Sequence, residues 1–220
     1  GTTGAVTLTA ATAGVLDATV AVGLTSNANG LAGLNNEGLT GQSVAVTGAA
    51  YDYAKPTVAA TLALGNVRAN TVGSLAVANT LVTSADFQDS LDVTAATAIA
   101  NLLVTAPANI AAGQASSVGL AIGAAGSLGG TITLGLTSNT NAVANLQTLV
   151  FADRTVTVTG AAYAYADAAV APTLTLGNIR VGATAPIAVA NTLVAADAAF
   201  QDRLDAAATS ANATLAFANP

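Results

Sequence analysis

Apolar and small polar residues alternate along much of the chain. The clearest stretches are Thr155–Thr159, which reads Thr-Val-Thr-Val-Thr, and residues 131–136, where Thr or Gly separates three apolar side chains. A two-residue period rich in β-branched side chains predicts strands with one buried face. The same pattern occurs in six further segments, each bounded by residue types that end strands. It predicts strands at 60–64, 74–79, 118–122, 172–176, 186–191 and 211–217. We therefore expect an all-β protein with almost no helix.

Several short sequence motifs occur twice, 112 residues apart. Gly23–Asn27, which reads Gly-Leu-Thr-Ser-Asn, recurs unchanged at Gly135–Asn139. After Val194 the offset becomes 113, because one residue has been inserted before Phe200, and surface loops tolerate such insertions. About eight short strands in a unit of 112 residues is the size of an immunoglobulin-like sandwich. The sequence predicts tandem immunoglobulin-like β-sandwich repeats of about 112 residues.

Two parts of this unit carry a family resemblance. Pro172–Ala183, followed by Ile187–Thr192, resembles the opening of Hydin-like immunoglobulin domains, which in bacterial surface proteins are called choice-of-anchor D repeats. Residues 111–120, 129–134 and 158–162 are similar to the closing half of those domains. The resemblance implies display and assembly at the cell surface rather than a chemical reaction.

The family pattern also sets the expected domain boundaries. A complete repeat would run over 54–165, residues 1–53 would be the closing half of one repeat, and residues 166–220 would be the opening half of the next. Open strand edges and exposed apolar faces recruit partners. We expect each half to be completed by another copy, by the same chain folding back, or by a longer continuous polypeptide, and we favour head-to-tail completion.

The two expected halves are nearly complementary. Laid on the middle copy, Pro220 falls on Pro107 and Gly1 falls on Gly113. Together they would make one repeat that lacks only the counterpart of residues 108–112.

Charge excludes some classes of partner. Charged residues are 7% of the chain, the net charge is −6 and five residues in all are Lys or Arg. Nucleic-acid binding needs clustered basic side chains, so we expect none. The longest uncharged stretch, between Asp92 and Asp153, is broken by Gly, Pro and polar residues, so we expect no membrane span. A surface with few charges favours packing against similar surfaces.

The residue types also argue against an enzyme. The chain has no His and no Cys, which rules out Ser-His and Cys-His nucleophile pairs, and Lys55, before Pro56, is interpreted as a surface linker residue. We name no catalytic, cofactor-binding or metal-ligating residue, and we expect the chain to need no cofactor.

Aspartates gather in one stretch of each copy. Asp86, Asp89 and Asp92 are followed in the second copy by Asp197, Asp202 and Asp205. Calcium prefers such oxygen ligands, but the spacing differs between the copies and no Asp-x-Asp-x-Asp-Gly loop is present. We interpret these carboxylates as solvated, or as partners of Arg203 and of the paired Arg68 and Arg180, and leave calcium as the alternative.

Tyrosines mark the expected domain ends. Tyr51 and Tyr53 recur as Tyr163 and Tyr165, two residues apart on what should be the last strand. With Arg68 and Arg180, these four tyrosines are the candidates for junction or assembly contacts.

Together these observations predict a structural, self-assembling component of an extracellular filament or surface layer, built from repeats stacked head to tail. Its main partner would be itself. The alternative is a stalk or binding repeat of a large bacterial adhesin that recognises a host or cell-surface ligand.

Overall fold

The computed structural model describes residues 4–218, and within them the protein is all-β. About 47% of the residues are in strands and 3% are helical, which confirms the predicted class. The helical residues described are two short 3₁₀ turns, η1 (Ala85–Phe87) and η2 (Ala198–Phe200). No helix among residues 4–218 is long and apolar enough to cross a membrane. The expected alignments of Gly1 and Pro220 fall outside the described residues.

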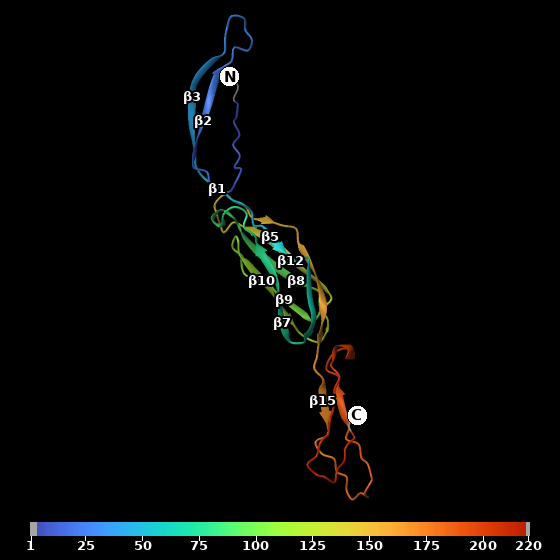
Figure 1. The fold of residues 1–220 in the computed structure, drawn as a ribbon. Helices are drawn as coiled ribbons and strands as arrows, with labels where there is room; N and C mark the ends of the chain where they lie inside the picture. The colour runs from blue at the N-terminus through green and yellow to red at the C-terminus, as the bar shows by residue number, and fades with distance from the viewer. Residues whose placement is uncertain (1–3, 219–220) are drawn as a thin grey trace.

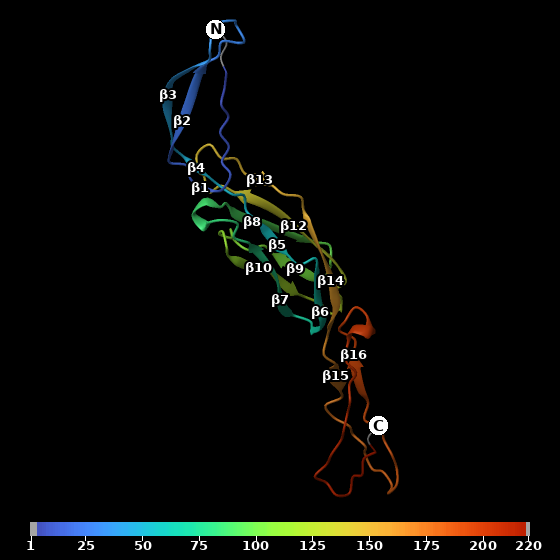
Figure 2. The same cartoon turned by 45° about the horizontal axis from the view of Figure 1, so that its top comes forward.

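The chain forms three consecutive parts along one axis (Figures 1 and 2). We call residues 54–165 the central unit, residues 4–53 the N-terminal segment and residues 166–218 the C-terminal segment. The two segments leave the central unit at opposite ends in both views.

The central unit contains two sheets. The first has the strand order β5-β7-β10-β9, and the second is built around β14 and β12, with β6 parallel to β14 and β8 antiparallel to β12. The strands are β5 (Pro56–Val58), β6 (Thr61–Arg68), β7 (Thr71–Asn79), β8 (Ser90–Thr97), β9 (Leu102–Thr105), β10 (Ala115–Ile122), β11 (Gly126–Ser127), β12 (Gly130–Asn139), β13 (Leu149–Val150) and β14 (Arg154–Tyr163).

Alternate side chains of both sheets bury the core. Ile132 and Leu134 of β12 lie in the same core cluster as Val118 and Leu120 of β10, and all four are fully or almost fully buried. The two-residue period seen in the sequence thus places one face of each strand inside, consistent with a β-sandwich.

The two segments are thinner. In the N-terminal segment, β1 (Gly14–Val15) pairs with β4 (Ala49–Ala50) and β2 (Ala18–Ser26) pairs with β3 (Glu37–Val46). In the C-terminal segment, β15 (Asp167–Val170) pairs with β16 (Val189–Thr192). Each of these three sheets has two strands.

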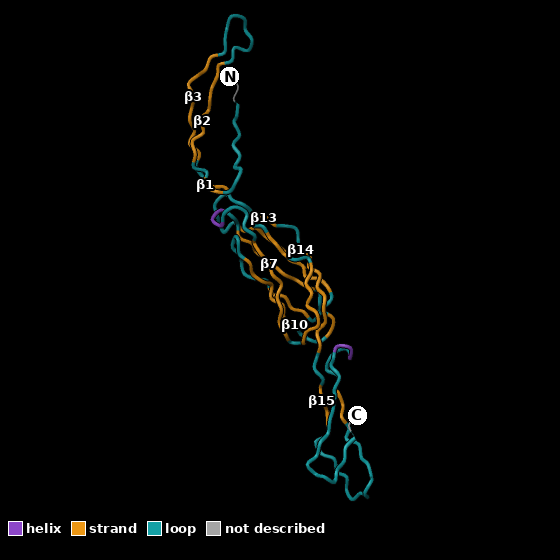
Figure 3. The backbone as a smooth tube through the Cα atoms, in the orientation of Figure 1, coloured by secondary structure: helices purple, strands orange, loops and turns teal. Residues whose placement is uncertain are grey.

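Two predicted strands are wrong and one is only partly right. Residues 172–176 and 211–217 are not strands, and of the expected strand over 186–191 only the end lies in β16 (Figure 3). Their counterparts in the central unit pair with β14 and β10, whereas no strand pairs with 172–176 or 211–217 in the part of the chain that the structure describes. An extended segment without a neighbour has no ladder to stabilise it.

Leu→Ala substitutions at two corresponding positions should distinguish the buried core of the central unit from the exposed apolar face of the N-terminal segment. Leu136 is 1% exposed in β12, and its counterpart Leu24 is 40% exposed in β2. In dilute protein, Leu136→Ala should lower the free energy of unfolding by about 2 to 5 kcal/mol, while Leu24→Ala should change it by less than about 1 kcal/mol. Urea unfolding at low protein concentration measures both, and equal losses would contradict this description of the core.

Candidate assembly surfaces

The N-terminal segment repeats part of the central unit with the same strand register. β2 pairs with β3 as β12 pairs with β13 and β14, shifted by 112 residues: Val20 lies opposite Val44, as Ile132 lies opposite Val156. The short β1–β4 ladder likewise repeats the β11–β14 ladder. The segment therefore has the hairpin of a complete sandwich without the strands that flank it.

The apolar face of this hairpin is uncovered. In the central unit β12 lies between β14 and β8, but β2 has β3 on one side and no strand on the other among the described residues. Val6 corresponds to Val118 of β10, and it is 74% exposed where Val118 is 0% exposed. Leu8 and Val44 are exposed in the same way. The N-terminal segment thus presents half of a core to solvent.

The C-terminal segment presents the other half. β15 and β16 pair in the register of β5 and β7, so that Val170 lies opposite Val189 as Val58 lies opposite Val77. Val77 is completely buried, whereas Val189 is 43% exposed. Because the counterparts of β10 to β14 are in the N-terminal segment, nothing within the C-terminal segment covers this face.

A buried polar network fixes the loop before β8 in the central unit. The Asn79 side chain is fully buried, and its Oδ1 accepts hydrogen bonds from the Lys55 backbone N–H (2.9 Å) and from Gln88 Nε2 (3.0 Å). Its Nδ2 donates to the carbonyl oxygens of Asp89 (2.9 Å) and Ile110 (3.2 Å). The Asn79 amide makes every strong hydrogen bond that it can, so its burial leaves no polar atom unpaired.

The C-terminal segment already contains most of this network. Asn191 Oδ1 accepts from the Asp167 backbone N–H (2.9 Å) and from Gln201 Nε2 (3.0 Å), and its Nδ2 donates to the Asp202 carbonyl (2.9 Å). The same three bonds are made by Asn79, 112 residues earlier, but here the side chains are exposed. The segment therefore has these polar contacts although its apolar face is exposed.

One member of the network has no counterpart in the C-terminal segment. In the central unit, Ser138 Oγ donates to Asp89 Oδ2 (2.7 Å) and accepts from the Ala54 backbone N–H (2.8 Å). The counterpart of Asp89 is Asp202, but the counterpart of Ser138 is Ser26, which lies in the N-terminal segment. The counterparts of these two groups therefore belong to segments that leave the central unit at opposite ends (Figure 1).

The tyrosine candidates lie at the two junctions between parts. Tyr163 packs against Phe200 with ring centroids 5.9 Å apart, and Tyr51 packs against Phe87 at 5.6 Å. Backbone bonds accompany each ring pair, since Ala164 N–H donates to the Phe200 carbonyl as Asp52 N–H does to that of Phe87. Each pair ties the end of one part to the loop of the next.

The arginine candidates differ in their surroundings. Arg68 Nη1 bonds Asp202 Oδ2 at 2.7 Å, and the guanidinium lies 4.2 Å from the ring centroid of Tyr165. Arg180, one repeat later, is exposed and forms no ion pair among the described residues. Tyr53, the counterpart of Tyr165, is exposed as well and has no cation over its ring in the described part of the chain.

Sequence reasoning did not identify the polar network. The motifs that recur between the two copies include Asn79 and Gln88, whose counterparts are Asn191 and Gln201. A polar residue that recurs unchanged within an apolar repeat signals a buried role, and this signal was available in the sequence.

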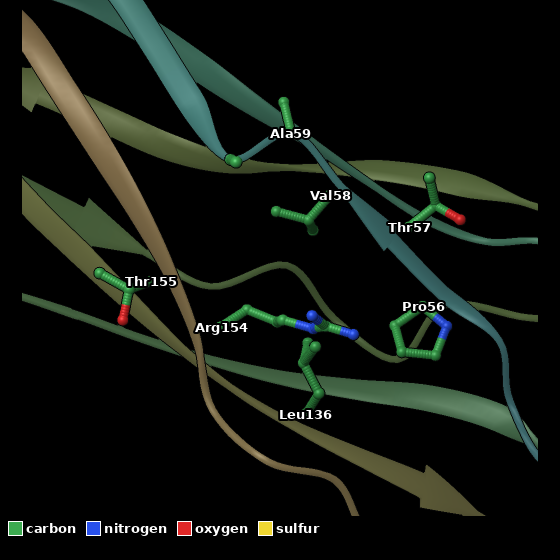
Figure 4. Close-up of a pocket in the computed structure, with 8 residues that line it drawn as sticks. Pro56, Thr57, Val58, Ala59, Leu136, Arg154 and Thr155 are labelled. Atoms are coloured by element: carbon green, nitrogen blue, oxygen red, sulfur yellow. The ribbon is translucent and has the colours of Figure 1, made fainter.

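Two surface hollows provide no catalytic arrangement. One of about 270 Å³ lies where the turn after β5 faces β12 and β14, with Arg154 extended between Pro56, Val58 and Leu136 (Figure 4). Arg154 is the only ionisable residue in its lining. The other, of about 300 Å³, lies at the Arg68 junction. The first lacks the paired acid and base that proton-transfer chemistry needs, and the second belongs to the contact already described.

Asp89 and Asp92 are held by hydroxyl and amide donors. Asp92 accepts from Asn109 Nδ2 (2.6 Å) and from Asn139 Nδ2 (2.5 Å), and residues 4–218 contain no group of three or more acidic side chains placed to hold a metal ion. We predict that a chelator will leave the thermal midpoint of the dilute chain unchanged in a scanning fluorescence or circular-dichroism measurement. A large fall that added Ca²⁺ reverses would show that the aspartates bind calcium.

Comparison with known proteins gives no family. No protein-family model matches the chain, and a search of curated proteins finds no match.

Proposed function

We propose that the chain is a structural protein that assembles with copies of itself into an extracellular filament or surface layer of immunoglobulin-like repeats stacked head to tail. The observation that supports this most is the pair of open half-cores. The N-terminal segment has the strand register of β11 to β14, and the C-terminal segment has that of the β5–β7 pair, each with its apolar face exposed.

The positions of the half-cores favour an open-ended assembly. They lie at opposite ends of the central unit (Figures 1 and 2). A contact between two different surfaces of the same molecule propagates into a filament unless rotation closes it into a ring. The same contact, repeated, would place one composite sandwich between every two central units.

The composition supports a structural role. With 7% charged residues, copies repel one another weakly, and the chain has no Cys, His or Met to oxidise or to bind soft metals. Both properties suit a protein displayed outside the cell.

The rival proposal is a stalk repeat of a long adhesin, in which neighbouring repeats of one polypeptide close the half-cores. Electron microscopy of the native material separates the two. Periodic fibres of stacked units support self-assembly, whereas isolated flexible rods support the stalk.

Self-assembly of the purified chain should depend on the exposed half-core. Sedimentation of the chain at rising concentration should show a monomer that gives way to large polymers. Val6→Asp or Leu8→Asp should raise the concentration needed for polymers by about 100-fold, because assembly would bury an unpaired charge.

The matched control is Val72→Asp. Val72 is as exposed as Val6, but it lies on β7 of the central unit. This variant should assemble as the parent does. A parent chain that stays monomeric at millimolar concentration, or a Val72→Asp variant as defective as Val6→Asp, would contradict the proposed function.

A further inference from the structure

We propose a specific joint between copies, which rests on the self-assembly proposed above. The N-terminal segment of one copy and the C-terminal segment of a second copy form one composite sandwich in the register of the central unit. Arg180 of the second copy stabilises this sandwich by binding Asp52 and packing on Tyr53 of the first copy.

Strand register follows from the 112-residue and 113-residue offsets. In the central unit, Thr133 of β12 lies opposite Ala96 of β8. The corresponding pair is Ala21 in β2 of one copy and Thr209 in the second copy. β2 therefore gains residues 203–210 as its missing antiparallel neighbour.

The second contact is the parallel one. Val158 of β14 lies beside Leu62 of β6, which corresponds to Val46 of one copy beside Leu174 of the second. Residues 172–176, which have no strand partner in the described chain, become a strand in the joint. This explains why the pattern there predicts a strand that a single chain does not form.

A glycine pair is already shaped for this parallel contact. Gly160 has φ +149°, and a Cβ there would lie 2.6 Å from the carbonyl oxygen of Gly65, which has φ +67°. Their counterparts Gly48 (φ +150°) and Gly177 (φ +62°) have the same conformations with nothing within 4 Å of a Cβ. L-residues rarely adopt these conformations, and glycine lets the two backbones of the parallel pair approach closely at the irregularity between Thr159 and Gly160.

The same shift places Arg180 at the joint. Arg68 lies beside Tyr163 in the β6–β14 ladder, where it reaches Asp202 and Tyr165. Moved by one repeat, Arg180 of the second copy lies beside Tyr51, over the Tyr53 ring and next to Asp89.

An independent observation marks the same place. Asp52 Oδ2 is buried and has no hydrogen-bond partner, the sole such side-chain atom in the described residues. Asp52 is adjacent to Asp89, whose backbone N–H donates to the Asp52 carbonyl at 2.9 Å. A buried carboxylate oxygen without a donor is costly, and a guanidinium supplies several donors. The arriving Arg180 is the group that this oxygen lacks.

Disulfide trapping tests the register. The chain has no Cys, so the introduced cysteines are the only thiols that can form a disulfide. Directly opposed antiparallel residues have Cα atoms about 4.5 to 5.5 Å apart, within the range that a disulfide spans. Under mild oxidation, the double variant Ala21→Cys/Thr209→Cys should give a ladder of covalent multimers on a non-reducing gel.

The matched control moves one thiol by one residue. Ala21→Cys/Ser210→Cys puts the two thiols on opposite faces of the sheet, so it should cross-link at least tenfold less. A disulfide formed within monomers of the first variant would show that each chain closes on itself and would overturn the joint. Polymers that form without selective cross-linking would overturn this register while leaving the proposed function intact.

Arginine variants test the lock. Arg180→Ala should raise the concentration needed for polymers about tenfold, because Asp52 is then buried in the joint without a donor. Arg68→Ala is the control, since Arg68 makes the corresponding contacts within its own chain, and it should change assembly less than twofold.

The Asp52→Asn variant distinguishes an effect on the joint between copies from an effect on the stability of the free chain. It removes an unpaired buried carboxylate, so the thermal midpoint of the free chain should stay the same or rise, while assembly weakens severalfold. Equal effects of Arg180→Ala and Arg68→Ala, or an Asp52→Asn variant that assembles as well as the parent, would overturn the proposed role of Arg180.

Discussion

A central strand needs a neighbour on both sides, and the arrangement of this chain depends on where that need is met. In the central unit β12 lies between β14 and β8, and its side chains form the middle of the core. β2 has the same sequence pattern and the same hairpin partner, yet its second edge is open. The open edge, the exposed Val6 and the exposed Val189 would all be covered by the one contact that we propose.

Apolar burial and polar matching have different tasks in this account. Burying a Val or Leu side chain that is otherwise exposed contributes about 1.5 to 3 kcal/mol, so the faces around Leu8 and Val189 supply the drive for completion. Such burial is not directional. The polar groups select the partner: Asp202 lacks the hydroxyl that Ser26 carries, and Asp52 has a buried oxygen without a donor. In the proposed joint, the paired segments of two copies satisfy both.

The sequence predicted the class well and the segments less well, for one physical reason. Alternation places Ile132 and Leu134 inside, and the structure confirms an all-β chain. The strands expected at 172–176 and 211–217 are absent because a strand depends on its neighbour as much as on its own residues. The contact of Arg68 with Asp202 matches one of the two interpretations of the aspartates. Asn79 was missed although it recurs as Asn191, whereas Asp52 was missed because Ala164 stands at its counterpart and no recurrence marks it.

Hydrogen exchange of the whole chain tests the central claim most directly, since it reports backbone pairing residue by residue in the dilute and the assembled protein. The account predicts rapid exchange in the dilute chain for the amides of β2, because an isolated two-stranded sheet is marginal, and for those of residues 203–207, which are in no strand. On assembly, they should become as protected as those of β12 and β8. Protection of both segments already in the dilute monomer, or continued rapid exchange in the assembled protein, would contradict the account.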